Sequence, residues 1–173
     1  GNKFLSHIRE VDAIIHLVRC FESDKITHVN SKINPVDDLE TIKTEIILSD
    51  LDIVQKKLEK GKKKLLAEKE IKILEDKLKR LNDGKEVVAN NKEEEKFLTT
   101  LGLLSIKPKI IVCNVDEDSL AKGNSYTESV KKNYSEEKVV TICADIEDQI
   151  MGLDNNERET FMKEIGLNKT GLN

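Results

Sequence analysis

Residues 110–117 read Ile110-Ile111-Val112-Cys113-Asn114-Val115-Asp116-Glu117, a short apolar run that passes directly into a polar turn. Two further apolar runs lie at residues 13–18 and 139–143. All three are almost continuous and rich in β-branched side chains, which is typical of strands buried on both faces of a parallel sheet. Helical patterns separate the runs, so the sequence predicts an α/β fold of three parallel strands with helices on both faces.

The segment between the first two strands is too long for a simple crossover. About ninety residues separate these strands, whereas a βαβ connection needs only about a dozen. Asn34 as N-cap and Pro35 at the first helical position mark a helix start. Apolar residues then recur every three or four positions, at 47, 51, 54 and 58 and again at 67, 71, 74, 78 and 81. Two such seams joined near Gly61 predict a projecting antiparallel coiled-coil hairpin.

Other helices are expected around this hairpin and after the second and third strands. One should present Phe97, Leu101 and Leu104 on a single face and run back to Pro108. Another is expected over residues 126–134, with short helices near 146–151 and 157–165.

The composition excludes several classes of protein. The 173 residues carry 29 Lys and Arg against 33 Asp and Glu, a net charge of −4, so the chain is no polycation that coats nucleic acid. Aromatic residues make up 3%, too few for a platform that stacks single strands. No apolar run approaches the roughly twenty residues that span a membrane. Three widely spaced cysteines suit reduced thiols, so we expect a soluble cytoplasmic protein without membrane or sequence-specific DNA partners.

A basic segment lies in the middle of the hairpin. Residues 56–80 hold eleven Lys and Arg and five Asp and Glu, a local charge of +6. Such a segment can bind the phosphates of a structured RNA through charge alone, with Lys62, Lys63 and Lys64 at the hairpin turn as the candidate contacts. The alternative is a solvated helix surface with ion pairs four residues apart, such as Glu59–Lys63.

Two polar turns could carry chemistry. Asn114 and Glu117 follow the second strand, at the sheet edge where parallel sheets bind ligands. An Asn amide can both donate to and accept from a purine edge, and a carboxylate three residues later can accept from an exocyclic amine. Cys143 and Ala144 end the third strand in the corresponding place. The alternative is a strand-to-loop turn in which Asn serves only the backbone.

Two kinds of site find no support in the sequence. No G-x-x-x-x-G-K-[ST] loop, which would cradle phosphates, occurs in the 173 residues. The three histidines are scattered along the chain, so neither a metal site nor a catalytic triad is expected.

Several blocks of the sequence resemble the YchF family of Obg-related P-loop NTPases. They are Gly1-Asn2-Lys3-Phe4-Leu5, His16-Leu17-Val18-Arg19-Cys20-Phe21-Glu22, Asn34-Pro35-Val36-Asp37-Asp38, Asn114-Val115-Asp116-Glu117 and Phe161-Met162-Lys163-Glu164-Ile165-Gly166-Leu167. The resemblance implies the second half of a G domain in residues 1–33 and 107–173, interrupted by the family's helical coiled-coil insertion in 34–106. The phosphate loop, the magnesium motif and the TGS domain would lie outside this chain.

The resemblance also implies a function. The family hydrolyses nucleotides and associates with ribosomes, and its N-x-x-E turn, in place of N-K-x-D, accompanies a preference for ATP over GTP. Carried over, Asn114 would contact the purine, Val115 would line the base site, and Glu117 would replace the guanine-binding aspartate. Cys143 and Ala144 would belong to the loop that closes over the base.

From the resemblance we expect an ATP or GTP hydrolase that uses Mg²⁺, whose ligands would lie outside these residues. The large ribosomal subunit or ribosomal RNA would be its partner. This chain alone should be inactive. The alternative function is a non-enzymatic helical module that binds the ribosome, RNA or a protein and is regulated by nucleotide.

Overall fold

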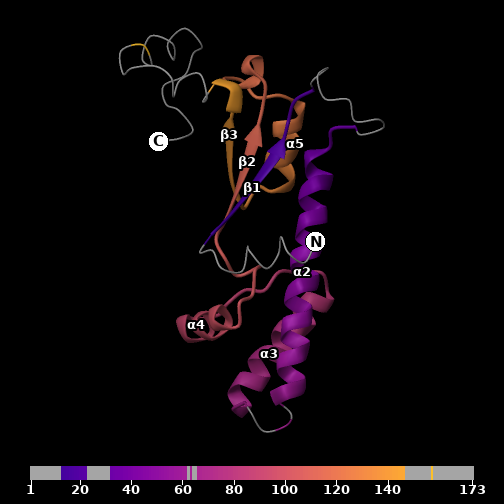
Figure 1. Cartoon of the computed structure of the whole chain (residues 1–173), viewed down its shortest axis with the longest axis vertical. Helices are drawn as coiled ribbons and strands as arrows, with labels where there is room; N and C mark the ends of the chain where they lie inside the picture. Colours follow the sequence, from indigo (N-terminus) through magenta and orange to yellow (C-terminus); the bar gives the residue numbers. More distant parts are fainter. Residues whose placement is uncertain (1–12, 23–31, 62, 64–65, 147–156, 158–173) are drawn as a thin grey trace. The chain divides into compact units, whose positions relative to one another are not determined.

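The computed structural model describes residues 13–22, 32–61, 63, 66–146 and 157 (Figure 1). These residues divide into two compact units. The helical unit comprises the described residues of Gly1–Ile14 and Glu40–Pro108, and the sheet unit comprises those of Ile15–Leu39 and Lys109–Asn173. The expected domain boundaries, with an insertion over 34–106, stay a prediction.

A three-stranded sheet confirms the predicted α/β fold. The strands are β1 (Ile14–Arg19), β2 (Lys109–Asn114) and β3 (Lys138–Ile142), in the order β1-β2-β3. Strands β2 and β3 are parallel, from Ile110 opposite Lys138 to Asn114 opposite Ile142. All three arrows point the same way in Figure 1. Each strand begins and ends within one residue of the predicted run, because β-branched residues form strands wherever turn residues bound them.

The sheet unit buries its core on the side of helix α5 (Ser125–Asn133). The core cluster, called the sheet core below, contains Val18, Cys20, Leu39, Ile111, Cys113, Val115 and Val130. Burial on both faces, which the sequence predicted, does not extend to β1, where Ile15 and Leu17 are 67% and 62% exposed. Successive side chains of a strand point to opposite faces of the sheet. Among the described residues, the face of β1 that carries Val18 is buried, whereas the face that carries Ile15 and Leu17 is exposed.

The helical unit contains the predicted hairpin. Helix α2 (Pro35–Lys60), whose first turn belongs to the sheet unit, begins where Asp37 N donates to Asn34 Oδ1 at 3.1 Å. Helix α3 (Glu68–Asn82) follows and ends before Gly84, whose φ of +74° favours glycine. The two helices lie side by side (Figure 1) and share one hydrophobic cluster. This cluster includes Val54 and Leu74, which are both fully buried. This packing confirms the predicted seams.

The third helix of this unit is shorter than the sequence predicted. Helix α4 covers Lys92–Thr100 and starts where Glu94 N donates to Asn91 Oδ1 at 2.8 Å. Gly102, at a φ of +77°, turns the chain away just after the helix. Leu104 therefore does not share a helical face with Phe97. It packs instead with Ile14 and Ile46 in a separate small cluster.

Buried polar groups fix the irregular segments of the helical unit. Asp50 is fully buried in α2, and its carboxylate accepts from Leu104 N at 2.7 Å and from Ser105 N at 2.9 Å. Ser105 Oγ in turn accepts from Val87 N at 3.0 Å. Because buried backbone N–H groups need partners, these contacts determine how the chain returns from α4 toward β2.

Two more helices were predicted toward the end of the chain. The helices expected near 146–151 and 157–165 lie almost entirely outside the described residues. Among the helices that the structure does describe, none combines the length and the apolar character needed to span a bilayer.

Candidate nucleotide-base site

Asn114 is the point where three segments of the sheet unit meet. Its backbone oxygen accepts from Cys20 N at 2.8 Å, just beyond the end of β1. Its side-chain Oδ1 accepts from Ala144 N at 3.0 Å, just beyond the end of β3. The structure therefore joins two of the predicted site residues, Asn114 and Ala144, through a direct hydrogen bond.

The ends of β2 and β3 hold this bond in place. Val115 N donates to Ile142 O at 2.8 Å, which continues the parallel pairing past Asn114. Cys143 is 2% exposed, and the backbone N–H groups of Asp145 and Ile146 donate to its thiol. Burial raises the pKa of Cys143 despite these two hydrogen bonds. The loop after β3 is thus anchored on both sides of Ala144.

The orientation of the Asn114 amide decides what it can bind. Since Oδ1 accepts from the Ala144 N–H, the Nδ2 amine is the group left to donate outward. Nδ2 donates in no hydrogen bond found among the described residues. A donor at this edge matches N7 of a purine, an acceptor that adenine and guanine share.

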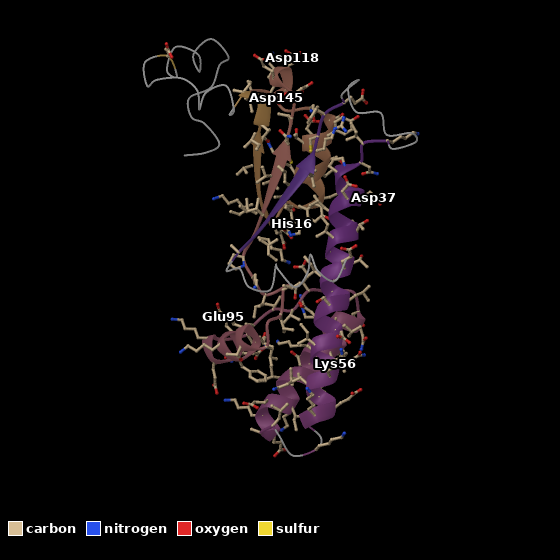
Figure 2. The ribbon with its side chains drawn as sticks, viewed as in Figure 1. His16, Asp37, Lys56, Glu95, Asp118 and Asp145 are labelled. Atoms are coloured by element: carbon tan, nitrogen blue, oxygen red, sulfur yellow. The ribbon has the colours of Figure 1, made fainter. Side chains whose placement is uncertain are left out.

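Glu117 lies at the same end of the sheet. It begins the short 3₁₀ helix η2 (Glu117–Ser119), and its side chain is exposed. Its negative charge contributes to the raised pKa of Cys143, so the carboxylate lies within electrostatic reach of the loop after β3. Figure 2 labels the neighbours Asp118 and Asp145 at this common end of the sheet. Asn114, Glu117 and Ala144 thus form one polar edge that can accept and donate hydrogen bonds.

Comparison with known proteins identifies relatives of the whole chain. No family model matches it. "Ribosome-binding ATPase YchF" of Bacillus subtilis is 39% identical over 185 residues, covering 99% of this chain and 50% of the relative. The Escherichia coli O157:H7 protein of the same name is 42% identical over 184 residues, covering 100% and 50%. The solved structure of the Schizosaccharomyces pombe YchF GTPase matches with a TM-score of 0.87 at 28% identity, covering 99% of this chain and 50% of that one.

The chain is homologous to YchF. It spans about half the length of the YchF proteins that it matches. The family resemblance read from the sequence is therefore confirmed over the whole chain, as is the α/β fold of three parallel strands with flanking helices.

Other predicted site residues of this YchF homologue have different surroundings. Val115 is 2% exposed and packs in the sheet core, while its backbone continues the strand pairing. Lys63 is exposed, and Lys62 and Lys64 lie outside the described residues. A base contact by Val115 and an RNA contact by the three lysines stay predictions.

Sequence reasoning missed Asn124 as a positioning residue of the sheet unit. Its Nδ2 donates to Cys20 O at 2.7 Å, and it caps α5 by exchanging hydrogen bonds with Thr127. Asn124 thereby ties the end of β1 to a helix, directly beside the bond between Cys20 and Asn114. The signal was present as an Asn followed three residues later by Thr at a helix start.

The three thiols lie at or near the strand ends of this edge. Cys20, Cys113 and Cys143 are free and buried. A hydrogen bond with Cys113, together with burial, raises the pKa of Cys20 far above its ordinary value. Across the described residues, His, Cys, Asp and Glu side chains do not gather in threes as a metal site would require.

Burial predicts that these thiols are protected in the folded protein. At pH 8 each should react with Ellman's reagent roughly a hundredfold more slowly in the native chain than in concentrated guanidinium chloride, because reaction needs local opening. Stopped-flow absorbance gives the rates, and mass spectrometry after alkylation assigns them to residues. A native thiol that reacts as fast as the denatured one would contradict this burial.

Proposed function

We propose that this chain is the base-reading part of a ribosome-associated nucleotide hydrolase that prefers ATP to GTP. The observation that carries the proposal is the hydrogen bond from Ala144 N to Asn114 Oδ1 at 3.0 Å. It links the two polar turns at one edge of a parallel sheet, the place where such sheets bind ligands. The names of the bacterial relatives support the hydrolase and the ribosome association.

The same bond supports the preference for adenine. Guanine carries an acceptor, O6, where adenine carries an amine, so a guanine site needs an N–H donor at that position. The Ala144 N–H is already engaged by Asn114. Glu117 contributes a carboxylate, which can accept from the adenine amine but repels O6. A purine with an amine at this position therefore fits the polar groups better than guanine does.

The catalytic groups would come from outside this chain. Phosphoryl transfer depends on positioning the phosphates and neutralising their charge, usually with Mg²⁺ and a phosphate-binding loop. The 173 residues contain no such loop. We therefore assign purine binding to Asn114 and Glu117, and phosphate and Mg²⁺ binding to the half of the YchF length that this chain does not span. The chain alone should not hydrolyse ATP.

The helical unit is proposed to contact the ribosome. The insertion predicted over residues 34–106 would contain the lysine-rich helices, and ribosomal RNA offers phosphates to such a surface. A ribosome partner would place the protein in the cytoplasm. If the protein is instead a helical binding module regulated by nucleotide, ribosome binding will respond to nucleotide without any turnover of ATP.

Replacement of Glu117 by Asp tests the base preference. In a full-length protein that carries this chain, Glu117→Asp should lower the ratio of ATP to GTP affinity roughly tenfold, because Asp positions its carboxylate for the two adjacent donors of guanine. Competition of unlabelled ATP and GTP against a fluorescent ATP analogue gives the ratio.

The control for this test is Glu128→Asp, the same change on the exposed surface of α5. It should leave the ratio unaltered. An unchanged ratio in Glu117→Asp, or an equal shift in both variants, would rule out Glu117 as a base-reading residue.

A further inference from the structure

An open pocket lies at the end of α3, within the helical unit. Its volume is about 420 Å³, and its walls include Lys79, Arg80, Lys85 and Asn90. Four cationic and two acidic residues line it in all. The pocket lies at the C-terminal end of α3. The lysines of the hairpin turn come before the N-terminal end of α3 in the sequence, so they are not part of this pocket.

The turn after α3 gathers these cations around the pocket. The N–H groups of Asp83, Gly84 and Lys85 donate to three carbonyl oxygens in the last turn of α3, at 3.1, 3.0 and 3.0 Å. Gly84, at a φ of +74°, allows the chain to fold back in this way. Because backbone groups satisfy these carbonyls, the cationic side chains are not needed to cap the helix.

Within the part of the chain that the structure describes, ion pairs neutralise only one of the four cationic side chains that line the pocket. Lys77 is 1% exposed and forms ion pairs with Asp76 and Glu94, so its charge is compensated within the protein. By contrast, no ion pair among the described contacts involves Lys79, Arg80 or Lys85.

Arg80 is held in a fixed position. Its Nε donates to Glu86 O at 2.5 Å, which orients the guanidinium, and Arg80 is half-buried. A planar guanidinium that shares a pocket with the flexible ammonium groups of Lys79 and Lys85 matches an anion with several oxygens. The pocket thus combines concavity, an excess of positive over negative side chains and one oriented donor.

We propose that this pocket binds a phosphate group through Lys79, Arg80 and Lys85. The phosphate can belong to an RNA backbone or to a free phosphate anion. Only the RNA source rests on the proposed ribosome association. In that case the pocket names a specific part of the helical unit that contacts ribosomal RNA, and it differs from the turn lysines that the sequence pointed to.

The first arm of the test uses RNA. The double variant Lys79→Gln/Lys85→Gln should bind a fluorescein-labelled ribosomal RNA hairpin roughly tenfold more weakly than the unaltered 173-residue chain, as measured by fluorescence anisotropy. The slope of log affinity against log salt should become shallower by about 1.4 to 1.8, because each of the two lost lysine contacts contributes about 0.7 to 0.9.

A matched variant controls for net charge. Lys92→Gln/Lys96→Gln removes the same two charges from the exposed surface of α4, outside this pocket. It should weaken RNA binding less than twofold. Circular dichroism melting curves will show whether both double variants fold as the unaltered chain does.

The second arm uses inorganic phosphate at constant ionic strength, followed by calorimetry. Saturable binding to the unaltered chain that is lost in Lys79→Gln/Lys85→Gln identifies a free-anion site, whereas selective loss of RNA binding alone identifies RNA as the source. If phosphate binds in the pocket but ribosomes do not co-sediment with the chain, the ribosome association fails and the pocket assignment stands. Equal RNA losses in the two double variants, or no loss in either, together with no phosphate binding, would overturn the proposal.

Discussion

Lys77→Ala should lower the free energy of unfolding of the helical unit by about 3–5 kcal/mol, the usual cost of leaving a buried charge without its partner. Lys77 is 1% exposed in α3, and its ammonium group pairs with Glu94 of α4, whose side chain is 9% exposed. Asp76, at 3.1 Å, is largely exposed and contributes less. Without Lys77, the Glu94 carboxylate stays buried with its charge uncompensated. Urea denaturation followed by circular dichroism measures the change.

Two further variants separate the buried pair from ordinary surface charge. Lys72→Ala removes the same side chain from an exposed pair with Glu68 at 3.9 Å and should cost less than about 1 kcal/mol. Lys77→Met/Glu94→Gln removes both charges and should recover most of the lost stability, since neither group is then left ionised and buried. Equal destabilisation by Lys77→Ala and Lys72→Ala would show that the buried pair has no special role.

The strands and the hairpin could be predicted from the sequence because both depend on local patterns. Runs rich in β-branched residues determine the strands, and apolar residues at heptad spacing determine which sides of α2 and α3 meet. The start of α2 at Asn34 and Pro35 is equally local, since an N-cap side chain serves the first turn of its own helix.

The rest of the fold depends on contacts between residues far apart in the chain. Asp50 accepts from backbone groups 54 and 55 residues later, and the Lys77–Glu94 pair joins two helices. No periodicity signals such contacts, because each requires a particular geometry that only the folded chain provides. Gly102, just beyond the early end of α4, is visible in the sequence, but its positive φ is not.

The candidate site shows the same division. The sequence placed Asn114 and Ala144 at neighbouring strand ends, because parallel strands end at a common edge. It could not show that Asn114 Oδ1 binds the backbone of Ala144, thirty residues away. Nor could it show that Val115 lies in the sheet core; the base contact that the family resemblance implied for this residue stays a prediction. A sequence motif gives only the spacing of residues along the chain. Which of their side chains point out of the sheet depends on how the strand ends in the folded protein.

The second large effect is expected at Asn114. Asn114→Ala removes the Nδ2 donor proposed to bind purine N7, and it also releases the Ala144 N–H that anchors the neighbouring loop. Each lost hydrogen bond costs about 1–1.5 kcal/mol. Together they predict roughly hundredfold weaker binding of ATP. GTP should weaken by a similar factor, because both purines present N7.

The most direct test of the base-reading role is the equilibrium affinity for ATP of a full-length protein that carries this chain. Isothermal titration calorimetry should compare the unaltered protein with Asn114→Ala and with Asn133→Ala, the same change on the exposed surface of α5. We expect roughly hundredfold weaker binding for Asn114→Ala and no change for Asn133→Ala. If Asn114→Ala binds ATP as tightly as the unaltered protein, Asn114 does not read the base.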